Sequence, residues 1–571
     1  MKDWQHQLYT GAQQQGQKPL YRFLSRRGAL TRTLSYDTVW QEANGLAQIL
    51  RREFKTGDRL LLLFEPELDF CVTLWACFLA GMVAIPLYPP ADPRTRERFL
   101  DIARDAEASG ILTTRSIYKK VKLARWLMPV FRRLRWIQVD DLSLPDPELL
   151  PSVPPEHLAL LQYTSGSTEK PKGVMLTHQN FMRNSEMLDL ASRMEGEFLG
   201  ERCVSWLPLY HDMGLMCGVI QPVYFGSESI LMSPLSFLQK PLRWLEAITT
   251  YRGTYAAAPN FAYDFCVKRI RAEQKNALDL RSWRFALNGA EPIRAETLRN
   301  FVEAFAPCGF AREAFFPAYG LAEATVFVSG AAVNQAPKVL QVSRLALQKG
   351  VLKPCSEASE QRDVEELVSV GQTYGGGKLC VVHPDSLKTL PEGEIGEVWL
   401  QSDSVGQGYW KKPERSREVF EATLAGASSG AEKWLRTGDF GTLYKGHLYI
   451  TGRRKDVIIL HGENHYPQRF ERLAETAHDG FRKGCNAAFG VLDEKGEEKV
   501  VIIQEVRDNT SQSIAALTQA LQEQVTEATR IPLHDVVLVR AGQIPKTSSG
   551  KVRRQETRQR YQKGKLKRWK M

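Results

Sequence analysis

Short apolar segments alternate with amphipathic helical segments through the N-terminal half of the chain. Residues 36–53 have the spacing of an amphipathic helix, and the apolar runs 59–64, 82–86 and 158–161 have the length of buried strands. Strands of this kind, separated by helices, are typical of a parallel sheet with helices on both faces. We therefore expect an α/β fold in which parallel α/β subdomains form most of a large domain.

The C-terminal half has a different pattern. Residues 379–382, 397–400 and 434–443 predict strands of a β-rich subdomain, and residues 451–458 place glycine and four charged residues between two apolar strands. We predict a large N-terminal domain over 1–454 and a small, mobile α+β C-terminal domain over 455–571. In the small domain we expect helices at 467–477 and 513–528 and strands at 486–492, 500–505 and 536–540.

Residues 70–88 are an uncharged stretch of nineteen residues. Gly81 and Pro86 inside it and Pro89-Pro90 after it argue against a membrane-spanning helix. We expect a buried helix at 71–80, the strand at 82–86, a Pro/Arg loop at 90–97 and a helix at 98–107. The N-terminus is polar, unlike a signal peptide, and nine scattered cysteines without Cys-x-x-Cys predict reduced thiols. A cytoplasmic protein with no integral membrane segment is expected.

The net charge of +11 is concentrated at the C-terminus. Residues 552–571 hold nine basic residues and one acidic residue, so the rest of the chain is only mildly basic. This distribution argues against a nucleic-acid binder. We interpret the tail as a solvated basic helix or a disordered segment, with binding to anionic lipid or to an acidic carrier as the alternative.

Residues 163–173 combine hydroxyls, glycines and lysines in one loop, which we expect to join a strand to a helix. Such a loop offers donors, backbone room and positive charge to a polyphosphate such as that of ATP. The alternative is a solvated polar turn, and no P-loop pattern occurs in the chain. The candidate phosphate-binding residues are Thr164, Ser165, Gly166, Ser167, Thr168 and Lys172.

Residues 204–216 predict a strand that runs into a His-Asp-x-Gly turn among apolar neighbours. His211 is a catalytic candidate, although a histidine in such a place is often a hydrogen-bonded structural residue. Asp212 could hold a substrate ammonium group, but a charge is costly to bury in apolar surroundings. The candidate substrate pocket comprises Trp206, Leu207, Asp212, Met213, Gly214 and Phe225.

Two further strand ends carry polar motifs, and ligands of parallel sheets bind beyond such ends. After 284–287 come Asn288, Gly289 and Ala290, and after 315–318 come Tyr319, Gly320 and Glu323. The glycines let a flat base approach the backbone, Tyr319 offers a stacking face, and Glu323 is a hard oxygen ligand for Mg²⁺. Asp439, within Arg-Thr-Gly-Asp, could accept hydrogen bonds from both ribose hydroxyls. Each motif taken singly could be an ordinary turn.

In this order the motifs resemble those of the adenylate-forming superfamily, which includes acyl-CoA synthetases, peptide-synthetase adenylation domains and luciferases. His-Asp-Met-Gly at 211–214 resembles the fatty-acyl-AMP ligases in particular. The resemblance implies that Lys551, after Ser-Gly in 544–554, is the catalytic lysine, that Arg453 contacts the nucleotide and that Lys455 is the hinge. Glu169 stands where the family usually has glycine, which leaves the shape of the phosphate loop open.

Forty-six residues separate Glu323 from Val370. The extra length at about 337–368 looks like the insertion of fatty-acyl-AMP ligases, which is linked in that family to poor release of acyl-CoA. A tolerated surface loop is the alternative.

The resemblance implies an enzyme that joins a fatty acid to AMP with ATP and Mg²⁺ and then passes the acyl group to a phosphopantetheinylated acyl carrier protein. The alternatives are an acyl-CoA synthetase, an amino-acid-activating enzyme, and a basic nucleic-acid or membrane-surface binder.

Overall fold

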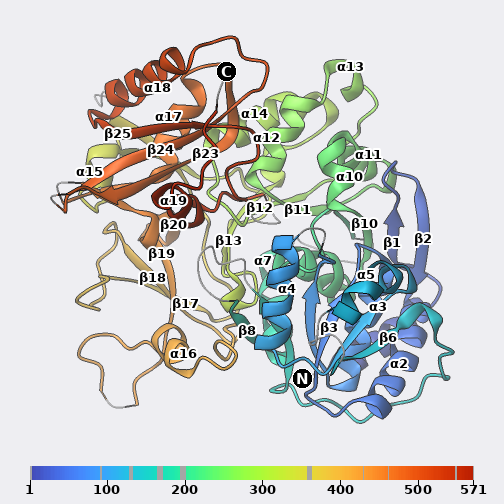
Figure 1. Ribbon diagram of the computed structural model, residues 1–571. Helices are drawn as coiled ribbons and strands as arrows, with labels where there is room; N and C mark the ends of the chain where they lie inside the picture. The colour runs from blue at the N-terminus through green and yellow to red at the C-terminus, as the bar shows by residue number, and fades with distance from the viewer. Residues whose placement is uncertain are drawn as a thin grey trace.

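The computed structural model describes residues 3–90, 93–127, 133–163, 171–192, 201–356, 363–428, 430–460, 462–494, 496–546 and 550–569. Figure 1 shows the N-terminal part of the chain (blue to green) around two large sheets, with the C-terminal part (orange to red) at the upper left. The expected α/β class is confirmed. No helix in the part of the chain that the structure describes has both the length and the apolar character needed to cross a bilayer.

The first large sheet has eight strands and is parallel except at its two edges. In spatial order the strands are β14 (Ser329–Gly330), β13 (Phe315–Tyr319), β12 (Phe285–Gly289), β11 (Tyr255–Pro259), β9 (Arg202–Ser205), β10 (Glu228–Met232), β1 (Pro19–Leu24) and β2 (Leu30–Ser35).

The second sheet has six strands, of which five are parallel. Its order is β6 (Arg135–Gln138), β5 (Gly110–Thr113), β3 (Arg59–Leu63), β4 (Val83–Leu87), β7 (Leu158–Tyr163) and β8 (Gly173–Thr177).

The helices of the large domain lie between and over these sheets, except the last helix of the following list, which lies beside the β-rich subdomain (Figure 1). They are α1 (Trp4–Gln15), α2 (Tyr36–Glu53), α3 (Leu68–Ala80), α4 (Pro93–Asp105), α5 (Arg115–Leu127), α7 (His178–Ser192), α8 (Asp212–Leu215), the π-helical segment η2 (Met216–Ile220), α9 (Gln221–Phe225), α10 (Pro234–Gln239), α11 (Leu242–Tyr251), α12 (Asn260–Arg269), α13 (Ala272–Lys275), α14 (Ala295–Phe305) and α16 (Pro413–Phe420).

The uncharged stretch at 70–88 is a core helix followed by a strand, as predicted. Almost every residue of α3 is buried, and the helix ends at Gly81, whose φ of 72° suits a glycine. The preceding helix α2 begins at Tyr36, as predicted, because the Ser35 side chain accepts a hydrogen bond from the Thr38 N–H and caps its N-terminus.

Two predictions in this region are wrong. Helix α4 begins at Pro93, inside the expected loop at 90–97, because proline is well suited to the first helical turn, where its missing N–H is not needed. The segment after the phosphate loop is a strand before it becomes a helix. Residues of β8 pair antiparallel with β7, from Tyr163 opposite Gly173 to Leu158 opposite Thr177, so the loop joins two strands of a hairpin.

The β-rich subdomain is a four-stranded antiparallel sheet of β17 (Lys378–Val382), β18 (Gly396–Gln401), β19 (Leu435–Tyr444) and β20 (His447–Arg453). The expected insertion contains β15 (Val339–Ser343), α15 (Arg344–Gln348) and β16 (Val364–Val368), and its two strands pair with each other.

The C-terminal part contains β21 (Ile458–Leu460), β22 (Glu463–His465), α17 (Pro467–Thr476), β23 (Phe481–Leu492), β24 (Glu498–Val506), α18 (Ile514–Thr529), β25 (Leu533–Val539) and α19 (Arg554–Gln562). Its core is separate from that of the large domain and contains Phe470, Ile502 and Leu521.

The basic tail is not simply solvated, which corrects the sequence interpretation. After α19 the chain returns to this core, where the Trp569 side chain is buried and the Trp569 backbone N–H donates to Leu538 O at 2.8 Å. Tyr561 and Leu566 also pack against the small domain, and the Tyr561 hydroxyl donates to Asp535 Oδ2 at 3.0 Å, so apolar and polar contacts together hold the tail on the domain.

His178 is a buried histidine at the start of α7, and its ring lies edge-on to Phe78 at 5.1 Å between centroids. Burial, with a contribution from His157, lowers the pKa of His178 to about 3. As the pH falls below about 6.5 the unfolded chain binds a proton here before the folded chain does, so the folded state loses stability.

We expect His178 to make the protein about 2 kcal/mol less stable at pH 5 than at pH 7. The His178→Asn variant should lose this part of the acid dependence in denaturant unfolding measured at both pH values. His6→Asn, which removes an exposed histidine, is the control and should keep the wild-type slope. An unchanged slope in His178→Asn would rule out this source of acid sensitivity.

Candidate active site

One large cavity lies where the C-terminal ends of β7, β9, β12 and β13 face the β-rich sheet and the small domain. It gathers candidates that are far apart in the sequence. The candidate residues that line it are Lys172, Trp206, Leu207, His211, Asp212, Met213, Gly214, Gly289, Ala290, Tyr319, Gly320, Glu323, Asp439, Arg453, Lys455 and Lys551.

The remaining candidates are not brought to this cavity by the described structure. Thr164, Ser165, Gly166, Ser167 and Thr168 lie outside the described residues. Phe225 packs at the end of α9 against Tyr224 and Tyr255 and does not line the cavity, because the turns from 212 to 225 carry it away from the His-Asp turn. Asn288 is fully buried behind the cavity wall, with its amide N–H donating to Asn260 Oδ1 at 3.4 Å.

The nucleotide candidates Tyr319, Asp439 and Arg453 form a connected group. The Tyr319 hydroxyl donates to Asp439 Oδ2 at 2.7 Å, and Arg453 Nε lies 3.4 Å from Asp439 Oδ1. Burial raises the pKa of the Tyr319 hydroxyl, and Asp439 raises the pKa of Arg453. The Asp439 carboxylate is therefore held between a donor and a cation at the cavity surface, where a ribose could accept or donate hydrogen bonds.

Glycines allow close approach of the backbone at this group. A Cβ on Gly289 would lie 2.9 Å from Ala318 O, and a Cβ on Gly320 would lie 1.6 Å from Val326 O. Ala290 has a φ of 66°, so the turn after β12 is held in a left-handed conformation that alanine rarely adopts. The two strand ends are thus packed directly against each other.

Glu323 lies beside a residue that the sequence reasoning missed. Tyr409 donates a hydrogen bond to Glu323 Oε1 at 2.8 Å, and Lys172 Nζ lies 5.6 Å from the centroid of the Tyr409 ring. Tyr409 therefore connects the lysine of the phosphate loop with the candidate metal ligand. An isolated tyrosine after a glycine-rich stretch gives no sequence signal for this role.

Within the described residues no three His, Cys, Asp or Glu side chains form a metal-binding group. In nucleotide sites Mg²⁺ commonly uses one or two protein carboxylates and completes its coordination with phosphate oxygens and water. Glu323 is a carboxylate of the right kind at the cavity surface.

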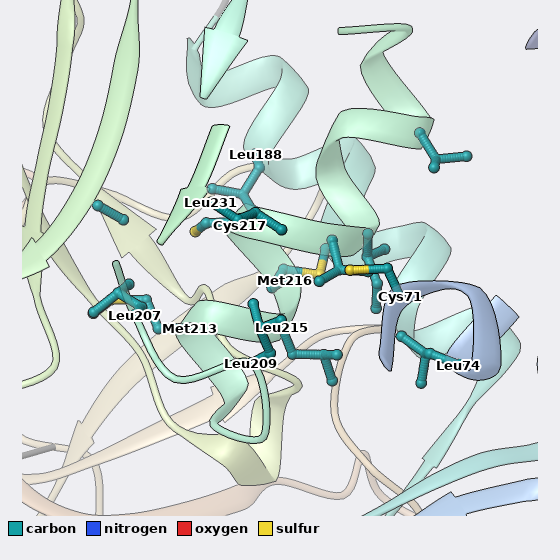
Figure 2. Close-up of a cluster of buried hydrophobic side chains, with 14 of the residues drawn as sticks. Cys71, Leu74, Leu188, Leu207, Leu209, Met213, Leu215, Met216, Cys217 and Leu231 are labelled. Carbon is teal, nitrogen blue, oxygen red and sulfur yellow. The ribbon is translucent and has the colours of Figure 1, made fainter. Parts of the chain in front are cut away.

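The wall near the His-Asp turn is apolar. Figure 2 shows Leu207, from the turn before α8, and Met213, from α8 itself, in one buried cluster with Leu188 and Cys217, and all four line the cavity. Trp206 stacks on Phe237 with ring centroids 4.0 Å apart and an interplanar angle of 9°. Such a surface suits a hydrocarbon chain. An unpaired ammonium group placed on it would lose its hydration without gaining a hydrogen-bond partner, which is unfavourable.

At the end of this wall His211 Nδ1 and Asp212 Oδ1 are in direct contact. Burial opposes ionisation of Asp212, but His211, Lys551 and the Met213 N–H together hold its pKa below the ordinary value. The carboxylate is therefore charged, and its charge is already matched by its neighbours.

Lys551 lies where the apolar wall and the nucleotide group meet. Burial lowers the pKa of its ammonium group, Asp212 and Glu291 oppose that effect, and Arg453 adds to it. Asp212 and Glu291 come from the substrate side, whereas Arg453 and Asp439, which also raises the pKa of Lys551, come from the nucleotide side. A cation at this point can neutralise charge that develops between an acid and a phosphate.

The hinge candidate Lys455 is tied to the segment that follows Lys551. Its carbonyl oxygen accepts a hydrogen bond from Gln555 Nε2 at 2.9 Å, and Arg554 contacts Asp456 at 3.4 Å and Glu471 at 2.6 and 2.7 Å. These contacts predict that the hinge and the lysine segment move together.

The insertion touches both domains. Successive side chains of a strand point to opposite faces, and in β16 Glu366 pairs with Arg299 of the large domain at 2.8 Å while Glu365 pairs with Arg472 of the small domain at 2.6 Å. Gln348 of α15 also lies 3.2 Å from His465. The insertion therefore bridges the two domains in this arrangement.

Comparisons with known proteins show which family the chain belongs to and which proteins it is similar to. A family model described as AMP-binding enzyme matches residues 8–410, and one described as Disco-interacting protein 2-like, AMP domain, matches residues 455–571. The chain is 40% identical over 564 residues to medium-chain-fatty-acid--[acyl-carrier-protein] ligase JamA of Moorena producens, covering 97% of this chain and 94% of that protein.

Two further relatives are similar over nearly their whole length. Long-chain-fatty-acid--AMP ligase FadD32 of Mycolicibacterium smegmatis is 34% identical, covering 97% of this chain and 93% of that protein. A fatty acyl-adenylate ligase from L. pneumophila, solved with acyl adenylate and pyrophosphate, is 36% identical with a TM-score of 0.75, covering 98% of this chain and 96% of that chain.

Proposed function

This chain belongs to the AMP-binding enzyme family, and from that premise we propose that it is a fatty-acyl-AMP ligase. It activates a fatty acid with ATP to acyl-AMP and pyrophosphate and then transfers the acyl group to the phosphopantetheine thiol of an acyl carrier protein. The observation that carries the proposal is the position of Lys551 between an apolar wall that ends in His211 and Asp212 and the group of Tyr319, Asp439 and Arg453.

In the first step an oxygen of the fatty carboxylate forms a bond to the α-phosphorus of ATP, and the bond from that phosphorus to the bridging oxygen of pyrophosphate breaks. Positioning and charge neutralisation supply most of the catalysis of such a displacement. Lys551 neutralises negative charge at the carboxylate and the α-phosphate, and Lys172 neutralises negative charge at the outer phosphates. Asp439 orients the ribose. Mg²⁺, held by Glu323 together with phosphate oxygens, would screen the remaining charge.

In the second step the carrier thiolate attacks the acyl carbon and AMP leaves. We propose that the small domain first rotates about Lys455, which removes Lys551 from the site.

The nine free cysteines of the chain fit a reducing compartment, so we assign the reaction to the cytoplasm.

The relatives named for transfer to an acyl carrier protein favour the carrier as acceptor over coenzyme A. The test offers preformed acyl-AMP with either coenzyme A or a phosphopantetheinylated carrier. We expect acyl-carrier product and little acyl-CoA, and acyl-CoA formed at a matching rate would instead identify an acyl-CoA synthetase.

The insertion contacts both domains through Glu366–Arg299 and Glu365–Arg472. We propose that these contacts resist domain rotation and so make coenzyme A a poorer acyl acceptor than the carrier protein. A carrier protein can use its own surface contacts to drive domain rotation, whereas free coenzyme A has fewer such contacts. Glu365→Lys reverses the charge that faces Arg472 and loosens the bridge. Because the pair is partly exposed, we expect a modest effect, about a threefold rise in the ratio of acyl-CoA to acyl-carrier product.

The matched control is the double variant Glu365→Lys with Arg472→Glu, which restores an opposite-charge pair and should return the ratio toward that of the wild type. If the single and double variants have the same ratio as the wild type, the Glu365–Arg472 contact plays no part in acceptor choice.

A further inference from the structure

The segment that carries Lys551 rests on an aromatic ring of the large domain. Gly550 has a φ of 87°, and a Cβ placed on it would lie 3.4 Å from Phe261 Cε1 and 3.6 Å from Cζ. The backbone next to the catalytic lysine therefore lies against the Phe261 ring. The contact joins the small domain to the start of α12 in the large domain.

The carboxylate of Glu291 holds the backbone of Phe261. Glu291 Oε1 accepts a hydrogen bond from the Phe261 N–H at 2.6 Å, in the first turn of α12, where N–H groups lack partners within the helix. Burial raises the pKa of Glu291, and the Phe261 N–H, Lys551 and Arg294 oppose that effect. One side chain thus fixes Phe261 and places a carboxylate near the lysine.

Helix α12 is a rigid base for this contact. Tyr263, two residues further along, is fully buried, its hydroxyl donates to Leu287 O at 3.0 Å, and its ring lies edge-on to Phe301 at 5.1 Å between centroids. The backbone of Phe261 is therefore anchored on one side by the core and on the other by Glu291.

The Phe261 ring also belongs to the apolar wall. It lies edge-on to Trp206 at 6.1 Å between centroids with an interplanar angle of 71°, and Phe261, Trp206 and Leu207 all line the cavity. One aromatic ring thus borders the surface for the acyl chain and supports the backbone that presents the lysine.

We propose that Phe261 and Glu291 are positioning residues that form a seat for the Lys551 segment and connect occupation of the acyl wall with correct placement of the lysine. The inference rests on the proposed function, because it concerns how a bound fatty acid promotes its own adenylation. An acyl chain that packs along Trp206 restricts the Phe261 ring, and the restricted ring supports Gly550.

The seat acts only while the lysine is docked, which separates the two half-reactions. Acyl-AMP formation needs the docked segment, whereas acyl transfer follows its removal. A residue that is only part of the acyl wall affects both steps, since both need the acyl group bound. A residue of the seat affects the first step selectively.

The test compares Phe261→Ala with Phe261→Leu, which keeps apolar volume beside Trp206. For Phe261→Ala we expect kcat for acyl-AMP formation from ATP and dodecanoic acid to fall at least about 10-fold, because small misplacements of a catalytic group are costly. Phe261→Leu should lie between the wild type and Phe261→Ala. Because Phe261 also borders the acyl wall, transfer from added dodecanoyl-AMP to the holo-carrier should slow as well, but several-fold less than acyl-AMP formation, and less in Phe261→Leu than in Phe261→Ala. Equal losses in the two half-reactions, or a rise in the KM for the fatty acid alone, would overturn the proposal.

Two further variants keep the proposal falsifiable if Phe261→Ala folds poorly. Glu291→Gln retains an oxygen acceptor for the Phe261 N–H and removes the charge near Lys551, and we expect it to slow acyl-AMP formation about threefold or more without changing the transfer step. In a Lys551→Ala background, Phe261→Leu should cause no additional loss in the first step, because residues that act as a unit are not additive. A full additional loss would contradict the seat.

The rates of acyl-AMP formation by the wild type and by the variants distinguish failure of the seat from failure of the proposed function. A wild-type enzyme that forms no acyl-AMP from any fatty acid rejects the function itself. A wild-type enzyme that forms acyl-AMP, together with variants that adenylate normally, rejects only the seat.

Discussion

The Lys551→Ala variant should form acyl-AMP about 10²-fold more slowly than the wild type, or slower still, while transferring the acyl group from added acyl-AMP at a near-normal rate. The expected loss is that of one preorganised donor to a developing charge. Lys551 lines the cavity, and its pKa responds to Asp212 and Glu291 on the substrate side and to Arg453 and Asp439 on the nucleotide side. Single-turnover measurement of each half-reaction separates the two rates.

Lys546→Ala is the matched control in the same segment. Lys546 contacts Cys485 Sγ at 3.3 Å and its backbone pairs with Val552, so its ammonium group is held within the small domain. We expect both half-reactions to remain within about threefold of the wild type in this variant. Equal losses in Lys546→Ala and Lys551→Ala, or a normal rate of acyl-AMP formation in Lys551→Ala, would contradict the assigned role.

Gly320→Ala should strongly weaken ATP binding. The added Cβ would lie 1.6 Å from the carbonyl oxygen of Val326, which is backbone and cannot rotate away. The turn must therefore move, and with it both Tyr319 and Glu323. We expect the KM for ATP to rise at least about 10-fold and the stability of the large domain to fall by about 1–3 kcal/mol, the range typical of overpacking.

Gly446→Ala is the comparison for Gly320→Ala. Gly446 lies in a turn with a φ of 73° and has no atom within 4 Å of an added Cβ, so its replacement tests backbone strain without a clash. The expected result is a small loss of stability and an unchanged KM for ATP. An unchanged KM for ATP in Gly320→Ala, measured by the same assay, would show that the turn does not shape the nucleotide site.

The fold class and many elements could be predicted because burial periodicity is a local property of the sequence. Helix α2 and the uncharged helix α3 are examples, since the first has a Ser35 cap and an amphipathic pattern and the second ends at Gly81. The hairpin of β7 and β8 was not predicted, because the pairing of Leu158 with Thr177 depends on register across a loop.

The candidate site could be predicted where a residue belongs to a motif and not where it acts by tertiary contact. Asp439 and Tyr319 were chosen from separate motifs, and the structure joins them by a hydrogen bond. Phe225 was chosen for being apolar and near His211 in sequence, yet it packs elsewhere. Tyr409 and Phe261 were missed because a single aromatic residue has no sequence signature, and their roles arise only from Glu323 and Gly550 across the fold.

The central claim is that these dispersed segments form one adenylating site. The most direct test measures the exchange of labelled pyrophosphate into ATP with a panel of fatty acids and amino acids. Mass spectrometry of the same reactions detects the mixed anhydride. We predict exchange and acyl-AMP with fatty acids, loss of both in Lys551→Ala, and no exchange with amino acids. Exchange driven by amino acids, or the absence of any acyl-AMP from ATP and fatty acids, would contradict the proposed site.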